Sequence, residues 1–520
     1  MSLFSTKSLD EIIAQANEAG LKKTLGAWNL IALGIGAIIG AGLFVRTAAA
    51  AGQAAGPAVV ISFLIAALGC AFAGICYAEF AAMIPIAGSA YAYSYVTMGE
   101  MIAWIIGWAL IMEYALGAAT VSIAWSEYLV KLMNDVFQVR IPYEWTHSPF
   151  ESFTDSAGVV HQGIFNLPAV FILLALTMLL IRGTQESAMV NAVIVIIKVA
   201  IVLAFVIIGW QFIRPENLTP FMIPEGTPPA VDGAGKVIHS YEGVFKHGWG
   251  GVLGGAAIVF FAFIGFDAVS TAAQEAKNPK RDMPIGILGS LVICTILYVL
   301  FGHVLTGAAP WSDFVDPTKG REASVSYVIS QYMHGYNWLA NAVTVAILAG
   351  FSSVILVMLM GQSRIFYTMA KDGLIPKVFS ELHPKYKTPY KSNWILLLFI
   401  SLFAAFVPGN VAGDLTSFGT LFAFVLVSLG VWIMRRKNPQ AHRPFRAPFV
   451  PVVPILGAVI CAGMIVAIDG DTLKAAFLWM GIGLIIYFSY SRHHSKLNKK
   501  GKPYSDILPS HDDFQATNEK

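Results

Sequence analysis

The residues with the clearest potential for chemistry are the glycines of the first long apolar segment, Gly34-Ile-Gly-Ala-Ile-Ile-Gly-Ala-Gly-Leu-Phe44. Each glycine in a helix interior costs roughly 1 kcal/mol relative to alanine, so four within nine residues predict a break in the helix. Within a bilayer, irregular backbone is tolerated only where protein or a water-filled cavity covers it. The stretch therefore predicts a binding site that offers main-chain groups to a ligand, although such glycines also serve in close helix packing.

A second apolar segment carries a comparable interruption, in Phe260-Phe-Ala-Phe-Ile-Gly-Phe-Asp-Ala-Val-Ser270. A broken helix exposes carbonyl groups, which suit an ammonium, and amide groups, which suit a carboxylate. Two such breaks match the zwitterionic head group of an α-amino acid. The predicted ligands are the amides of Ala41 and Gly42 for the carboxylate and the carbonyls of Ile38, Phe261 and Ile264 for the amino group, with Ala262 in the same lining.

Lys198 lies at the centre of another apolar segment, with five apolar residues on each side. An ionisable residue at this depth is costly and indicates a function by default. Burial of a lysine favours its neutral amine, so Lys198 is a candidate for reversible proton release. The alternative is a lysine that is permanently paired and purely structural.

Other polar residues at similar depth are weaker candidates. Glu113 and Asp267 are carboxylates within apolar segments; each could pair with Lys198, take part in proton transfer, contact a substrate side chain or serve only the structure. Serine hydroxyls in membrane helices often bond to their own backbone, which is the alternative to a functional role. The remaining candidates are Ser352 and Ser353, with Tyr298 as a possible charge partner and His303 as a weaker candidate near a helix end.

Apolar segments long enough to cross a membrane must position these residues. The chain of 520 residues is 56% hydrophobic and 12% charged, which excludes an ordinary soluble domain. A spanning helix needs about 20 apolar residues. The sequence therefore predicts an all-α membrane protein with twelve transmembrane helices, at 27–50, 57–83, 100–133, 166–182, 187–213, 250–273, 284–307, 338–368, 393–408, 415–434, 450–468 and 474–491.

The distribution of basic residues predicts the topology. Most of the 34 lysine and arginine residues fall on one side of the twelve segments, the side that also carries both ends of the chain. Basic residues concentrate in cytoplasmic loops, so both termini are predicted to be cytoplasmic and the protein to be a multi-pass protein of the cell membrane. The basic runs are thus topology signals, and nucleic-acid binding is a remote alternative.

Several signatures of other protein classes are missing from the sequence. It contains no Gly-x4-Gly-Lys-Ser/Thr phosphate loop, no His-Glu-x-x-His and no Cys-x-x-Cys motif. The four cysteines all fall in apolar segments and are expected to be small core residues. We therefore expect a protein that is not an enzyme, needs no cofactor or metal, and uses an ion gradient as its driving force. No residue indicates an accessory small membrane subunit.

The positions of the two interruptions predict an internal repeat. They lie in the first and sixth segments, and five intervening spans reverse orientation across the membrane, as in inverted-repeat transporters. Residues 1–24 are expected to form a partly amphipathic segment on the membrane surface, and 323–333 a short helix in an outer loop. The predicted organisation is 1–24 cytoplasmic segment, 25–213 first repeat, 214–249 outer loop, 250–435 second repeat, 436–492 two peripheral spans and 493–520 cytoplasmic tail.

These motifs together resemble the amino acid–polyamine–organocation (APC) superfamily, and most closely the bacterial relatives of the cationic amino acid transporters. The resemblance covers about residues 20–495. It rests on the glycine-rich stretch 34–44, Tyr77-Ala-Glu-Phe80 with Pro85-Ile-Ala-Gly-Ser-Ala-Tyr91, Phe263-Ile-Gly-Phe-Asp-Ala-Val269, Glu275-x-Lys-Asn-Pro-x-Arg-Asp-Met-Pro284 and Gln362-Ser-Arg-Ile-Phe-Tyr-Thr-Met-Ala-Lys-Asp-Gly-Leu-Ile-Pro376.

The resemblance implies a LeuT-type fold, which consists of two inverted repeats of five helices and, in addition, two peripheral helices. It also implies alternating access around the two breaks. Proton-coupled members of the family have a lysine in the fifth span, and Lys198 matches it. By the same match, the Gly36 carbonyl and the Ser352 and Ser353 hydroxyls would face its ammonium.

The sequence thus predicts a secondary active transporter that couples amino acid uptake to protons. The lining inferred around Phe261 is apolar and favours alanine-like neutral amino acids, with cationic amino acids kept open through Asp267 and Glu113. The alternatives are an exchanger of amino acids or polyamines and an amino acid sensor that binds without transport. The identity of the amino acid, the oligomeric state and the direction of transport are not fixed by these residues.

Overall fold

A computed structural model describes residues 5–7, 25–40, 42–84, 88–154, 159–182, 187–231, 235–273, 276–315, 324–386 and 388–497. Within these residues, eight helices are long and apolar enough to cross a membrane, and four shorter apolar helices accompany them. Each of the twelve predicted segments corresponds to one of these helices or to a part of one. The chain is therefore an all-α membrane protein, as predicted.

The first half of the chain contains five helical spans and one short helix between the second and third. The elements are α2 (Ala27–Ile38), η1 (Gly42–Arg46), α3 (Thr47–Ala50), η2 (Ala51–Ala55), η3 (Gly56–Ala58), α4 (Val59–Met83), α5 (Ser89–Thr97), α6 (Glu100–Ile111), η4 (Met112–Leu116), α7 (Gly117–Asp135), α8 (Leu167–Arg182), α9 (Ser187–Gly209) and η6 (Trp210–Phe212).

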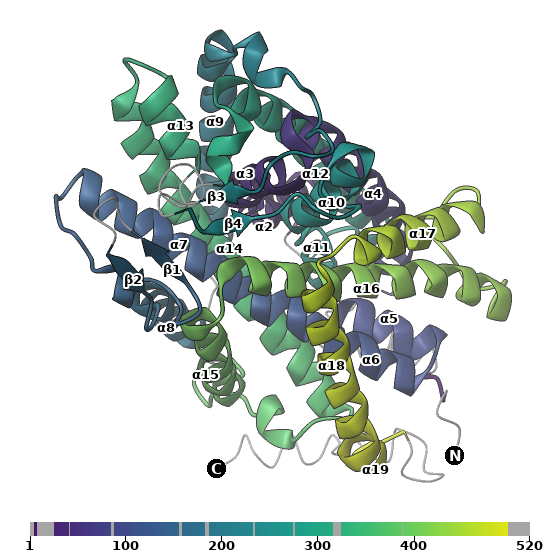
Figure 1. The fold of residues 1–520 in the computed structure, drawn as a ribbon. Helices are drawn as coiled ribbons and strands as arrows, with labels where there is room; N and C mark the ends of the chain where they lie inside the picture. Colours follow the sequence, from purple (N-terminus) through teal and green to yellow (C-terminus); the bar gives the residue numbers. More distant parts are fainter. Residues whose placement is uncertain are drawn as a thin grey trace.

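The described residues of the second half are also mainly helical. Its elements are α10 (Gly248–Val259), η8 (Phe260–Phe263), α11 (Ala268–Thr271), α12 (Pro279–Ala308), α13 (Ser324–Tyr332), α14 (Asn337–Lys371), η11 (Lys377–Ser380), α15 (Tyr390–Phe406), α16 (Gly409–Lys437), α17 (Val452–Val466), α18 (Gly470–Ile486), η12 (Tyr487–Ser491) and α19 (Arg492–His494). Figure 1 shows α2, α10 and α12 close together inside the bundle, with α8, α15, α17 and α18 nearer its periphery.

Both predicted helix breaks are present. The first helix α2 ends at Ile38, Ile39 has an extended backbone, and helical structure resumes at Gly42. The sixth span changes to a tight 3-10 turn after Val259, becomes extended at Ile264 and resumes as α11 at Ala268. In both spans the break therefore falls where the glycines predicted it.

The loops that were predicted to lie on the outer side differ in part from the prediction. The expected helix at 323–333 is present as α13. The other two long loops contain 3-10 turns at η5 (Tyr143–Trp145) and η7 (Pro215–Leu218), together with hairpins that the sequence did not predict. These hairpins pair β1 (Ser152–Thr154) with β2 (Val160–Gln162) and β3 (Ala230–Val231) with β4 (Val237–His239), both antiparallel. The predicted surface helix within 1–24 lies almost wholly outside the described residues.

A main-chain contact joins the start of the first span to the segment after the sixth. Leu25 forms a parallel β-bridge with Ala276, and the amide of Lys277 donates to the Leu25 carbonyl at 2.8 Å. The ends of two broken spans are thereby tied together through backbone atoms alone.

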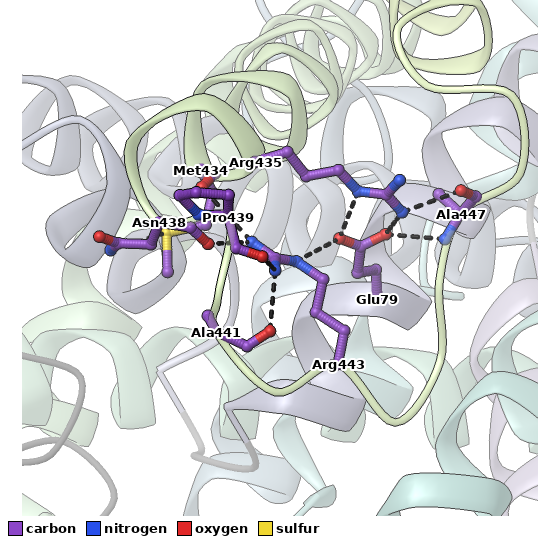
Figure 2. Close-up of polar contacts among 8 residues, drawn as sticks. All are labelled: Glu79, Met434, Arg435, Asn438, Pro439, Ala441, Arg443 and Ala447. Atoms are coloured by element: carbon purple, nitrogen blue, oxygen red, sulfur yellow. Dashed lines mark hydrogen bonds and ion pairs between the residues drawn. The ribbon is translucent and has the colours of Figure 1, made fainter.

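A buried ionic cluster secures the end of α4, as Figure 2 shows. The Glu79 carboxylate accepts two hydrogen bonds from Arg435, at 3.1 and 2.6 Å, and one from the amide of Ala447 at 2.7 Å. Arg443 lies on its other side at 3.3 Å and also donates to carbonyls at the end of α16. A charge that the sequence placed in an apolar segment thus fixes the α16–α17 connection to α4.

The four cysteines are buried and unpaired, which confirms their prediction as core residues. The last span is fastened to the third by tryptophans. Trp108 stacks on Trp479 with ring centroids 4.8 Å apart, and the Trp104 ring nitrogen donates to the Gly483 carbonyl at 2.8 Å. The division of the chain into inverted repeats at the predicted boundaries remains a prediction.

Candidate functional site

The two helix breaks touch each other directly. A Cβ atom on Gly42 would lie 2.2 Å from the Cα atom of Ala262, and one on Gly265 would lie 2.9 Å from the Ala37 carbonyl oxygen. Gly265 also has a φ of +114°, which L side chains rarely adopt. Glycine is therefore required at these positions for a physical reason, because only backbone without side chains allows the two spans to meet.

Tyr298 of α12 joins the two breaks. Its hydroxyl group lies 3.0 Å from the Ile38 carbonyl and 2.8 Å from the Ala262 carbonyl, one from each broken span. Its ring packs between Phe63 and Phe263, with centroid distances of 5.4 and 5.2 Å. The sequence suggested Tyr298 as a charge partner, whereas the structure places its hydroxyl on main-chain oxygens.

The residues predicted to bind an amino acid head group lie together at this junction. Ile38, Gly42, Phe261, Ala262 and Ile264 are all buried around it, whereas Ala41 lies outside the described residues.

Some of the predicted carbonyl ligands already accept hydrogen bonds. The Phe261 carbonyl accepts from the Ile264 amide at 3.3 Å, and the Ile38 carbonyl accepts from Tyr298. A carbonyl oxygen has two lone pairs, so each retains one acceptor position for a ligand.

Lys198 of α9 contacts the first break from the other side. Its ammonium donates to the Gly36 carbonyl at 2.8 Å and to the Ile39 carbonyl at 3.0 Å, and its side chain is buried. The Gly36 carbonyl belongs to the last turn of α2 and the Ile39 carbonyl directly follows it, where the end of a helix leaves acceptors without intrahelical partners. The expected contact with Gly36 is thus present, and Ile39 is a partner that the sequence did not indicate.

The eighth span approaches Lys198 through a glycine. A Cβ atom on Gly350 of α14 would lie 2.8 Å from the Cε atom of Lys198. The predicted neighbour Ser352 instead donates its hydroxyl to the Leu348 carbonyl of its own helix at 2.9 Å. Ser353 is buried in the same helix.

The two buried carboxyl groups form a separate cluster. Asp267 accepts a hydrogen bond from the Tyr114 hydroxyl at 2.7 Å, and Glu113 adjoins it from the same π-helical turn as Tyr114. Among the described residues, no ion pair joins Lys198 to either carboxylate. The structure therefore does not contain the pairing with Lys198 that was one of the roles considered for Glu113 and Asp267. The physical reason is that the carbonyls at the end of α2 already bind the ammonium.

Sequence reasoning missed Tyr114 and Gly350. Tyr114 directly follows Glu113, and π-helical turns are frequent at functional sites, but nothing in the sequence signals such a turn. Gly350 resembles many glycines of apolar segments, and only its contact with Lys198 distinguishes it.

Comparison with known proteins identifies relatives along most of the chain. The chain is 42% identical over 502 residues to the branched-chain amino acid permease BcaP of Bacillus subtilis (strain 168), covering 96% of this chain and 99% of that protein. It is 40% identical over 500 residues to the methylthioribose transporter of the same organism, covering 96% and 100%. It is also 32% identical over 442 residues to the vacuolar cationic amino acid transporter 4 of Arabidopsis thaliana, covering 84% and 68%.

The profile of one protein family matches nearly the whole helical part of the chain. That family is described as amino acid permease, and the match extends over residues 25–489, which include both breaks and Lys198. The match confirms the predicted resemblance to the APC superfamily and the prediction of a transporter instead of an enzyme. With its two glycine-broken spans meeting inside a membrane bundle, the chain belongs to the amino acid permease family.

Proposed function

We propose that this amino acid transporter is a proton-coupled symporter that works by alternating access in the cell membrane, with both termini cytoplasmic. The observation that carries the proposal is the Lys198 ammonium on the carbonyls of Gly36 and Ile39 at the break of the first span. When charged, Lys198 holds α9 to α2; when neutral, it loses most of this attraction. Proton release from one buried lysine thereby alters the conformation of the broken span.

The carboxyl cluster supplies a second place for a proton. Two adjoining buried carboxylates repel each other strongly, so the pair is stable when it shares a proton or a cation. Glu113 and Asp267 meet this description, and Tyr114 donates to the Asp267 carboxyl at 2.7 Å. Asp267 also directly precedes α11, so protonation in this cluster acts next to the second break.

The substrate site lies at the junction of the breaks. We place the carboxylate of the amino acid at the amides that follow the first break, including Gly42, and its amino group at the carbonyls of Ile38, Phe261 and Ile264. The apolar lining supports neutral substrates, and one relative is named for branched-chain amino acids. Another relative is named for methylthioribose at 40% identity, so overall similarity does not determine the side chain that is accepted.

The LeuT-type arrangement is part of the same proposal. Its support is the contact between breaks in the first and sixth spans, which is where two inverted repeats would place their equivalent glycines. The proton gradient is proposed as the sole driving force, without a cofactor or an obligatory accessory subunit.

Transport assays with purified protein in liposomes test this function. Labelled alanine, leucine and arginine are supplied with and without an inward proton gradient. Gradient-driven accumulation of a substrate supports symport. Uptake only when the liposomes are preloaded supports an exchanger, and saturable binding without uptake supports a sensor.

The coupling role of the lysine has its own test. Lys198→Ala is expected to lower gradient-driven accumulation at least tenfold while counterflow continues, because binding at the breaks does not require the ammonium. Lys131→Ala is the matched control, since Lys131 lies at a helix end in an ion pair with Asp135. Unchanged accumulation in Lys198→Ala would contradict proton coupling through this residue.

A further inference from the structure

Two described segments near the ends of the chain, residues 5–7 and 491–497, meet on one face of the bundle. Near the N-terminus, the Lys7 amide donates to the Tyr95 carbonyl at 3.3 Å, and the Glu100 amide donates to the Ser5 carbonyl at 3.1 Å. The Lys7 side chain forms a buried ion pair with Asp372, directly after α14. Residues 5–7 are therefore docked on the ends of α5, α6 and α14.

Residues 491–497, here called the strap, bind to the same acidic residues from the other end of the chain. The Lys496 amide donates to the Asp372 carbonyl at 3.1 Å, and the Ser495 hydroxyl donates to the Glu100 carboxylate. Ser495 is fully buried. The strap thus contacts both residues that receive the N-terminal segment.

The turn after α14 is shaped to receive the strap. Gly373 has a φ of +84°, and a Cβ atom there would lie 2.5 Å from the His494 carbonyl oxygen. This close approach of two backbones is an observation independent of the hydrogen bonds. It indicates that the strap position is built into the fold.

Positive charge surrounds the docked segments. The Lys7 ammonium pairs with Asp372, and burial lowers the pKa of Lys496, with Lys371, Lys377 and Lys7 acting in the same direction and Asp372 in the opposite one. Asp372 also accepts from the Tyr91 hydroxyl at 2.7 Å. The Asp372 carboxylate thus binds both Lys7 and Tyr91, so a displacement of Asp372 would loosen the docking of residues 5–7.

The strap and the N-terminal segment belong to different parts of the bundle. The strap continues from the last span, which the tryptophans fasten to α6, whereas residues 5–7 precede the first broken span. We propose that the strap is a latch that holds Glu100 and Asp372 in position for residues 5–7 and so keeps the termini-bearing side of the transporter closed. The inference rests on the proposed alternating access and adds a control of its closed state by the C-terminal segment.

A reporter cysteine measures opening on this side without any transport. Ser270 of α11 is fully buried and donates to the Ser89 hydroxyl of α5 at 2.9 Å. Ser270→Cys is labelled with a membrane-impermeant thiol reagent from the termini-bearing side, and the rate is corrected with the chain that lacks this substitution. Because labelling needs neither substrate flux nor protons, failure of the symport proposal does not affect the result.

Three variants in this reporter chain decide the proposal. Ser495→Ala removes the hydroxyl that binds Glu100, and Gly373→Ala displaces the strap backbone. Ser489→Ala is the matched control, since the Ser489 hydroxyl donates to the Ile486 carbonyl of its own helix at 3.3 Å. All are compared as protein that elutes as a single species.

We expect the labelling rate to rise at least threefold in Ser495→Ala and in Gly373→Ala and to stay unchanged in Ser489→Ala. An unchanged or slower rate in Ser495→Ala overturns the latch. An equal rise in Ser489→Ala also overturns it, because any loosening of the last helix would then have the same effect. If Gly373→Ala fails to fold, Ser495→Ala alone decides the outcome.

Discussion

The two broken spans achieve the same irregular backbone by different means. In the first, carbonyls at the end of α2 are bound by side chains of other spans, namely Lys198 and Tyr298. In the sixth, the chain passes through a 3-10 turn, the Ile264 amide bonds to the Phe261 carbonyl, and Gly265 provides the reversal at positive φ. The first break thus depends on a charged side chain from another span, whereas the sixth, apart from the Tyr298 hydroxyl at the Ala262 carbonyl, is shaped by its own backbone.

This difference indicates how a proton acts at each break: on a lysine that binds the main chain of the first, and on a carboxyl cluster beside the second. A break that is held by a lysine from another helix changes when the lysine loses its charge. A break that is held by backbone hydrogen bonds and a glycine has no comparable titrating partner in its main chain. Substitutions at the two breaks should therefore separate loss of coupling from loss of folding.

The largest effect is expected where the breaks touch. Gly42→Ala places a methyl group 2.2 Å from the Ala262 Cα atom, so the two spans must separate. Overpacking against backbone should cost about 3 kcal/mol or more and abolish uptake. Gly481→Ala in α18 is the control, because a Cβ atom there meets nothing within 4 Å. Wild-type uptake in Gly42→Ala liposomes would show that the breaks do not need this contact.

Gly265→Ala tests whether the sixth break depends on its own backbone. Alanine at φ of +114° is strained by about 1–3 kcal/mol, and its Cβ atom would also press on the Ala37 carbonyl. Gly335→Ala separates the backbone strain from the contact with Ala37, since Gly335 has a φ of +90° and open space around it. We expect a larger fall in apparent melting temperature for Gly265→Ala. Equal falls would mean that contact with the first span contributes nothing.

Tyr298→Phe removes the hydroxyl that serves both breaks while keeping the ring contacts. The Ile38 and Ala262 carbonyls then lose a donor, which should cost about 1–2 kcal/mol and reduce uptake several-fold. Tyr128→Phe is a suitable comparison, because its hydroxyl lies at a longer 3.4 Å from the Phe44 carbonyl. Thermal unfolding followed by tryptophan fluorescence would rank the stability of the two variants. A larger loss of stability in Tyr128→Phe would contradict a role of the Tyr298 hydroxyl in stabilising the junction of the breaks.

The smallest effect should come from Gly350→Ala. Its added methyl group presses on the flexible stem of Lys198, which can shift at a cost of under about 1 kcal/mol. Folding should be unchanged, while the proton concentration for half-maximal uptake moves by a few-fold. Gly302→Ala, whose Cβ atom would make an ordinary 3.4 Å contact with Phe63, should leave this concentration unchanged. Identical pH profiles for both variants would place the eighth span outside the coupling step.

Much of this architecture could be predicted from the sequence because its signals are local. Long apolar runs determine the spans, and clustered glycines determine both breaks. The contact of Lys198 with Gly36 came from family resemblance, since no local pattern joins residues 162 positions apart. The roles of Tyr298 and Gly350 depend on which faces of distant helices meet, and the small outer hairpins depend on pairing of strands two or three residues long.

The main-chain bridge between Leu25 and Ala276 has a mechanical consequence. It links the start of α2, far from the break, to the segment that follows the sixth span, so these two parts are displaced as one body. With 12 residues, α2 is a rigid rod about 18 Å long, and a tilt of about 10° at its break moves its far end by about 3 Å. The bridge transmits this displacement to the chain beyond the second break. A small rotation at the glycines of the first break therefore moves α2 and the segment after α11 together.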